Sequence, residues 1–239
     1  LNMGTVAAMV GVIFFFVMGA VNRKIGPRVT SFICLILGGV GYFGMGHANS
    51  LAQYAIALCI CTIGCMSAGY ISGGAFVAQW FPKKKGIVMG ITTIGMNLAS
   101  ALINWILSGL SGQFQISGAL SILGGVVILL AILLGIFVKA TPEEAGCYPD
   151  NDPEIAAIIK AEEEGVKEME KVSYVGALKN KYVWIFGLGA GCFGLATVGI
   201  MSQLVSYFMA ARGYELTGAL SMLTIAAVIG MVGSWAWGV

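Results

Sequence analysis

Charged residues are scarce in this sequence. Only 10% of the 239 residues are Asp, Glu, Lys or Arg, whereas 58% are hydrophobic, and the mean hydropathy is +0.90. Because soluble domains carry about 25% charged residues, the composition excludes an ordinary soluble domain. The net charge of +2 does not by itself point to any partner, and we expect no nucleic-acid partner.

Residues for metal, redox or nucleotide chemistry are also few. The chain has one histidine, and its six cysteines form no C-x-x-C pair, so we predict no metal site, no cofactor and no enzymatic activity. Residues 189–194 (GAGCFG) satisfy G-x-G-x-x-G, but a long uncharged apolar run has no room for the strand–loop–helix unit that binds dinucleotides. We interpret these glycines as helix-packing residues.

Seven long apolar runs fill most of the chain. A helix needs about 20 mainly apolar residues to cross the hydrocarbon layer, and lipid offers no hydrogen-bond partner to a backbone that is not helical. The sequence therefore predicts an all-α, polytopic membrane helix bundle. The predicted spans are residues 1–21, 29–47, 51–81, 86–110, 117–138, 182–211 and 215–239.

The basic residues lie almost entirely on one side of these spans. Twelve of the thirteen belong to the connections after the first, third and fifth spans, and only Arg212 lies on the opposite side. Lys and Arg accumulate in cytoplasmic loops. We therefore expect a multi-pass protein of the cell membrane with these three connections in the cytoplasm.

The connection 139–181 is the one extended polar region, with ten acidic residues and six lysines. Asp152 can cap a helix that has Pro153 in its first turn, and Glu154 suits the positive end of that helix. An apolar stripe along it contains Ile155, Ile158, Ile159, Val166 and Met169. We expect a surface helix against the membrane or the bundle; a partner-recruiting module is the alternative.

An internal repeat links the two ends of the chain. Residues 5–11 read TVAAMVG and residues 224–230 read TIAAVIG, and each is followed eight positions later by another glycine. The two segments lie six spans apart and run in the same direction across the membrane. This pattern indicates a parallel pseudo-repeat about an axis along the membrane normal.

A short basic motif follows the first span. Residues 19–28 read GAVNRKIGPR, which resembles the G-x-x-x-D-R/K-x-G-R/P-R signature of the major facilitator superfamily. In that family the motif forms part of the cytoplasmic gate, and Arg23 stands here at the position of an acid that helps to lock it. The matching residues are Gly19, Lys24, Gly26 and Arg28.

A second stretch resembles one branch of that superfamily. Residues 80–95 (WFPKKKGIVMGITTIG) are similar to the junction of the fourth and fifth helices in monocarboxylate and oxalate/formate antiporter-like transporters. The resemblance implies a partial major-facilitator fold. Residues 1–138 would be helices 2–6 of twelve, 139–181 the central cytoplasmic loop and 182–239 helices 7–8, with the remaining transporter helices missing from this chain.

Neutral polar residues are the candidates for a substrate pathway. Small and polar residues recur along one face of the span 86–110 and include Asn97 and Asn104, which either hydrogen-bond between helices or line the solute path. Tyr70 and, on one face of the seventh-helix equivalent, Gln203 and Tyr207 are further candidates, because the resemblance places their helices at the cavity. Apart from Glu215 at the entry of the last span, no predicted span holds an Asp, Glu, Lys or Arg of the kind that proton coupling or a fixed anion site normally uses.

The resulting hypothesis is a secondary transporter that moves a small solute by alternating access. The resemblance implies an organic anion such as a carboxylate, with a coupling ion or a counter-substrate and the lipid bilayer as further partners. Two alternatives remain open from the sequence: a seven-helix receptor or sensor, and a non-transporting membrane scaffold.

Overall fold

A computed structural model of the chain describes residues 3–158 and 179–238. Within these ranges the side chains of a few residues are not described, namely residues 3–9, 12, 13, 16, 100, 101, 104, 108, 195, 198, 199, 201, 202, 235, 237 and 238. The described residues form helices and turns without any β-strand. This confirms the predicted all-α bundle.

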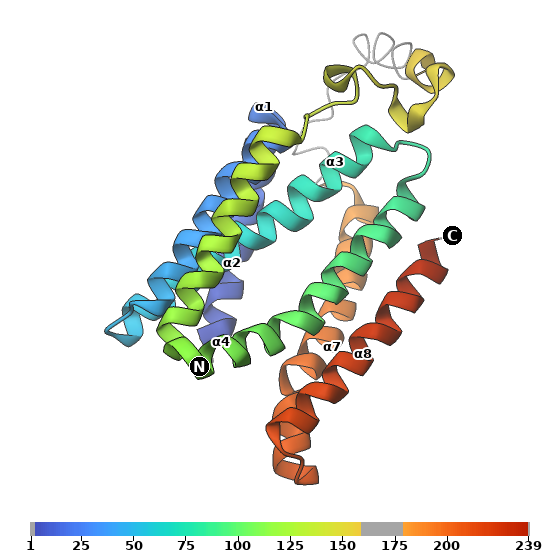
Figure 1. Cartoon of the computed structure of the whole chain (residues 1–239). Helices are drawn as coiled ribbons and strands as arrows, with labels where there is room; N and C mark the ends of the chain where they lie inside the picture. Colours follow the sequence, from blue (N-terminus) through green and yellow to red (C-terminus); the bar gives the residue numbers. More distant parts are fainter. Residues whose placement is uncertain (1–2, 159–178, 239) are drawn as a thin grey trace.

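Helix α1 spans Met3–Gly46 and joins two predicted membrane spans (Figure 1). The predicted loop between them is reduced to a break at Gly26, which has φ 82° and ψ 162°. That conformation is essentially restricted to glycine. Pro27, which cannot donate a backbone hydrogen bond to the preceding turn, directly follows the break and is buried.

The predicted span 51–81 is helical from Leu51 to Trp80, and its middle is a π-helix. Helix α2 (Leu51–Met66) continues into the π-helix η1 (Ser67–Ser72) and then into α3 (Gly73–Trp80). Ser50 caps α2 by accepting a 3.2 Å hydrogen bond from the backbone N–H of Gln53.

Helix α4 (Lys85–Phe137) likewise joins two predicted spans, with a break at Gln115 (φ 59°, ψ 169°). The 3-10 turns η2 (Glu143–Ala145) and η3 (Pro149–Asn151) follow it. Helix α7 (Lys181–Arg212) is capped by Asn180 and ends at Gly213, where φ is 68°. Helix α8 (Leu216–Gly238) completes the described chain.

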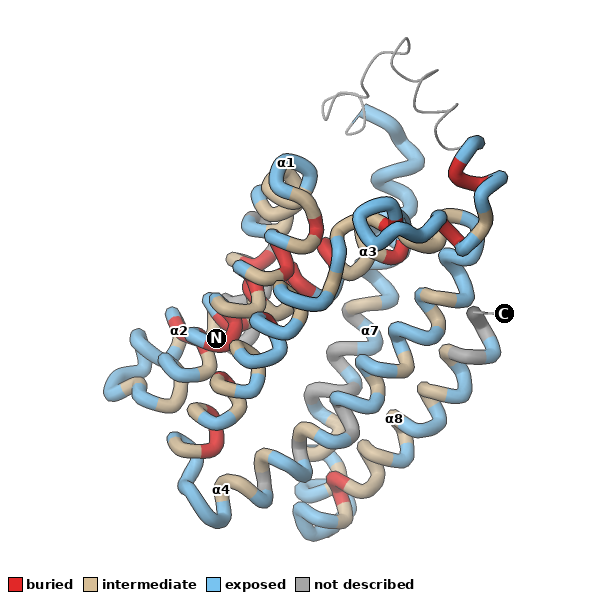
Figure 2. The backbone as a smooth tube through the Cα atoms, turned by 45° about the horizontal axis from the view of Figure 1, so that its top comes forward, coloured by how far each residue is buried: buried red, intermediate tan, exposed pale blue. Residues whose placement is uncertain are grey.

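The helices form two groups joined by α4 (Figure 1). The first group contains the second part of α1, α2, η1, α3 and the C-terminal part of α4, and the second group contains α7 and α8. The second part of α1 packs against α2, η1 and the C-terminal part of α4, whereas the N-terminal part of α4 runs beside α8, which also packs on α7. Most of the buried positions belong to the first group, and α7 and α8 are largely exposed (Figure 2).

Close backbone contact holds α1 and α2 together. A Cβ atom at Gly41 would lie 2.5 Å from the Cys61 backbone nitrogen, and one at Gly64 would lie 2.5 Å from the Cys34 carbonyl oxygen. Small residues permit this approach between membrane helices. Cys34 and Cys61 are buried at this contact.

Four helical segments of the described chain are long and apolar enough to cross a membrane: Val17–Gly46, Leu51–Trp80, Gly109–Phe137 and Leu216–Ser234. The described residues of the predicted spans 1–21, 86–110 and 182–211 also lie in helices, but some side chains in each of these spans are not described. The full set of seven spans therefore stays a prediction.

The predicted helix of the central connection begins where expected. Residues 153–158 are helical, and the Asp152 carboxylate accepts a 3.0 Å hydrogen bond from the backbone N–H of Glu154. Ile155 is 5% exposed, whereas Ile158 is 51% exposed. Ile159, Val166 and Met169, the rest of the predicted stripe, lie outside the described residues.

Candidate functional site

Two polar contacts join α4 to α8. The Asn97 Nδ2 atom donates to Ser234 Oγ at 3.3 Å, and the Trp105 Nε1 atom donates to Thr224 Oγ1 at 3.0 Å. The paired numbers rise along α4 as they fall along α8, so the two helices pack antiparallel. Asn97 therefore makes an interhelical hydrogen bond, which was one of its two predicted roles.

A glycine of the internal repeat lies at this interface. A Cβ atom at Gly230 would meet the Asn97 amide at 3.6 Å, an ordinary contact distance. The repeat copy 224–230 thus begins with the partner of Trp105 and ends against Asn97. Gly11, which ends the other copy, is buried on α1 with no neighbouring atom within 4 Å of such a Cβ.

Tyr70 lies on the π-helix η1, and its side chain is 61% exposed. The same segment has two fully buried serines. Ser72 donates to Asn22 Oδ1 of α1 at 3.3 Å, and the Ser67 Oγ has no hydrogen-bond partner among the described residues. Single π turns within helices frequently mark functional sites. Tyr70 is therefore exposed on a π-helix that is hydrogen-bonded to α1 through Ser72 and Asn22.

The α7 candidates are open to their surroundings. Gln203 is exposed, and Tyr207 is 48% exposed with its ring edge-on to Phe208 at 5.8 Å between centroids. Phe208 in turn stacks edge-on with Tyr214, at 5.7 Å. Neither Gln203 nor Tyr207 has a described hydrogen bond or ring contact with Tyr70.

Asn104 lies on α4 between Asn97 and the break at Gln115, and its side chain is not described. Of the five predicted pathway residues, the structure thus brings Asn97 into contact with the opposite helix group. The other described candidates are exposed, Tyr70 on η1 and both Gln203 and Tyr207 on α7. Their role in binding solute stays a prediction.

The four matching residues of the basic motif occupy distinct environments. The Arg28 guanidinium donates to the backbone carbonyl oxygen of Gly135, near the C-terminus of α4, where a cation is favourable. Lys24 is exposed, and Gly19 has an open surrounding. Gly26 supplies the break in α1. Arg28 thus joins α1 to α4, and the gating role of the motif stays a prediction.

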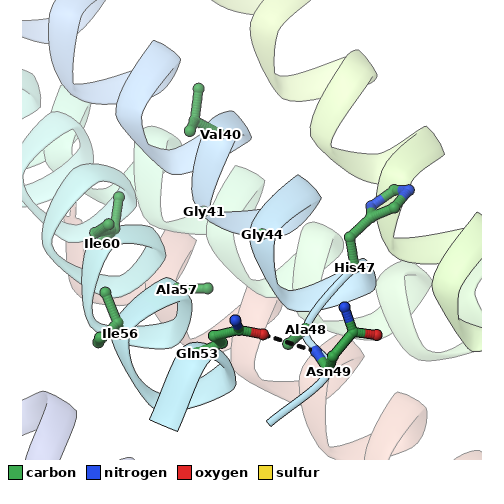
Figure 3. A pocket seen from close by; sticks show the side chains of 10 residues that line it. All are labelled: Val40, Gly41, Gly44, His47, Ala48, Asn49, Gln53, Ile56, Ala57 and Ile60. Carbon is green, nitrogen blue, oxygen red and sulfur yellow. Dashed lines mark hydrogen bonds between the residues drawn. The ribbon is translucent and has the colours of Figure 1, made fainter.

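A cavity of about 400 Å³ lies between the end of α1 and the start of α2 (Figure 3). Its walls are apolar, and its polar rim consists of His47, Asn49 and Gln53. The Gln53 side chain accepts a 2.9 Å hydrogen bond from the Asn49 backbone N–H, and His47 contacts the Phe43 carbonyl oxygen of its own helix. The cavity includes none of the predicted pathway residues.

The sequence did not predict which other residues form the α4–α8 contacts. Trp105, Thr224 and Ser234 form the α4–α8 contacts, and the available signal was the spacing of isolated polar residues in the apolar run 215–239. Asn22 was also missed, although it stands directly before the basic residues of the motif. The contact of Asp150 with the 81–84 turn, described below, had no signal in local sequence.

Comparison with known families gives one match. The family model described as Major Facilitator Superfamily matches residues 2–239. No curated protein and no solved structure matches the chain. The match does not favour a receptor or a scaffold, and it agrees with the apolar helices and with the motif at 19–28. The chain belongs to the major facilitator superfamily and is a multi-pass membrane protein of a family of secondary transporters for small solutes.

Proposed function

We propose that the protein transports a small organic anion, such as a carboxylate, by alternating access. The observation that carries the mechanism is the α4–α8 interface, where two hydrogen bonds between neutral side chains join the two helices. The anionic cargo and the antiporter-like branch are supported by the resemblance of residues 80–95. The cargo moves with a coupling ion or against a counter-substrate.

The α4–α8 contacts suit a moving interface. Interhelical hydrogen bonds of neutral side chains in membranes average about 0.6 kcal/mol, so they can break and reform without a large barrier. A salt bridge in lipid would be harder to separate because its charges would lose their partners. In this proposal α8 moves against α4 while Asn97 and Trp105 exchange partners.

Neutral donors bind the cargo in this proposal. The Tyr70 hydroxyl and the amides of Gln203 and Asn104 supply hydrogen bonds to a carboxylate, and Tyr207 contributes a hydroxyl and an apolar ring face. Tyr70 is the residue best supported. It is exposed on a π-helix in which the buried Ser67 hydroxyl has no hydrogen-bond partner in the described part of the chain. The connections rich in Lys and Arg face the cytoplasm of the cell.

Uptake by cells expressing the protein from its full reading frame tests the cargo. Radiolabelled small carboxylates should accumulate above the level in control cells, and neutral sugars should not. Uptake of sugars alone would contradict both the anion proposal and the branch assignment.

The Tyr70→Phe variant tests the site. Loss of one hydrogen bond to a charged group costs about 1.5–3 kcal/mol, so the KM for the carboxylate should rise roughly tenfold or more. Tyr182→Phe is the matched control, because Tyr182 is 67% exposed at the start of α7 and belongs to no proposed site. Equal KM values for Tyr70→Phe and the unaltered protein would remove Tyr70 from the pathway.

A further inference from the structure

Asp150 is a buried acid in a polar connection. Its side chain is 6% exposed, although it belongs to the turn η3 between α4 and the helix at 153–158. One carboxylate oxygen accepts a hydrogen bond from the Lys83 backbone N–H at 2.8 Å, and the other accepts one from the Lys84 backbone N–H at 3.3 Å. The carboxylate thus contacts the turn that links α3 to α4.

The start of α4 needs such a partner. Its N-cap residue is Lys84, which makes no side-chain capping bond, and its first turn has no acidic residue. Three consecutive lysines, Lys83–Lys85, stand at this end, where the helix dipole disfavours positive charge. A carboxylate at this position accepts hydrogen bonds from backbone N–H groups and brings a negative charge to the start of the helix. It therefore supplies both the missing cap and the missing acid.

The backbone around Asp150 is shaped to make this contact. Asp150 has φ 53° and the next residue, Asn151, has φ 61°. Residues other than glycine rarely adopt this left-handed conformation, and Asn and Asp are the ones that tolerate it best. Two such residues in succession persist only where surrounding contacts fix them.

We propose that Asp150 is a positioning residue that caps α4 from a distance and fastens the beginning of the central connection to the first helix group. The connection is then held at residue 150, on the turn between α3 and α4. This function does not depend on the nature of the cargo. In this proposal Asp150 attaches the first part of the central connection to the turn between α3 and α4.

Limited digestion of the reconstituted protein with trypsin tests the proposal. Trypsin must draw the backbone at Lys83–Lys85 into an extended form, so cleavage there follows release of the turn. Asp150→Asn removes the charge and one acceptor oxygen but keeps the shape. Because hydrogen bonds to charged groups are strong, cleavage at Lys83–Lys85 should become roughly tenfold faster or more.

Asp152→Asn is the matched control. Asp152 lies two residues away and caps its own helix, and Asn caps equally well, so cleavage at Lys83–Lys85 should stay at the original rate. Hydrogen exchange of the Lys83 and Lys84 amides gives a second readout and should accelerate in Asp150→Asn alone. Unchanged cleavage and exchange in Asp150→Asn, or equal acceleration in both variants, would overturn the proposal. Neither readout requires transport.

Discussion

The hydrogen bond between Asn97 and Ser234 shows how one neutral side chain can join two membrane helices. In lipid, an amide without a partner is costly, so Asn97 of α4 selects a polar position on α8. Sequence pattern predicted a polar role for Asn97. It could not name Ser234, because the face that α8 turns toward α4 is decided by packing between distant segments.

A double-mutant cycle of Asn97→Ala and Ser234→Ala measures this contact. We expect a coupling free energy of about 0.6 kcal/mol, with about 1.7 kcal/mol as the upper end. The measurement is unfolding in mixed micelles, monitored for both single variants and the double variant. Strictly additive effects would show that the two side chains do not interact.

Gly26 is a residue whose backbone angles explain its place in the motif. With φ at 82° and ψ at 162°, a side chain there would cost about 1–3 kcal/mol. Gly26→Ala should therefore lower the amount of folded protein and its thermal midpoint in detergent. Gly19→Ala, in the same motif but inside α1 with open space around it, should leave both unchanged or raise them slightly. Equal effects of the two substitutions would contradict this interpretation.

At the scale of the element, apolar run length predicted where helices lie but not how they join. The basic residues around 22–28 suggested a loop, whereas the structure interrupts α1 only at Gly26, because a single residue with unusual angles is enough to redirect a helix. The break at Gln115 and the π turn Ser67–Ser72 had no local signal. A π turn differs from an α turn by one residue, and packing against α1 decides it.

The α1–α2 pair gives a test of close helix packing. Gly41→Ala would drive a methyl group into the Cys61 backbone at 2.5 Å, which cannot move without separating the helices, so we expect a loss of about 1–3 kcal/mol in stability. Gly125→Ala, on α4 with nothing within 4 Å, should be neutral or slightly stabilising. Thermal unfolding in detergent compares the two. A neutral Gly41→Ala would show that α1 and α2 do not touch at this point.

At the scale of the whole molecule, the distribution of charge predicts orientation. The joint between α1 and α4, the Lys83–Lys85 turn and the central connection all belong to the side with twelve of the thirteen basic residues. The positions of the charged residues could predict that these segments lie on the same side of the membrane. It could not predict that Asp150 and Lys83 meet there, because 67 residues separate them in the chain.

The native cysteines allow this orientation to be measured. Cys147 is exposed in the central connection, so a membrane-impermeant maleimide should label it in inside-out vesicles and not in right-side-out vesicles. Cys147→Ser controls for reaction at other cysteines. Labelling of Cys147 only in right-side-out vesicles would invert the proposed topology.

Alternating exposure of one solute site is most directly measured by counterflow. Proteoliposomes containing the protein expressed from its full reading frame are loaded with an unlabelled small carboxylate and diluted into a trace of the labelled compound without ATP. A transient accumulation of label inside, absent from protein-free liposomes, is the predicted result. Label that never exceeds the protein-free level, across the carboxylates and neutral solutes tested, would contradict transport by this mechanism.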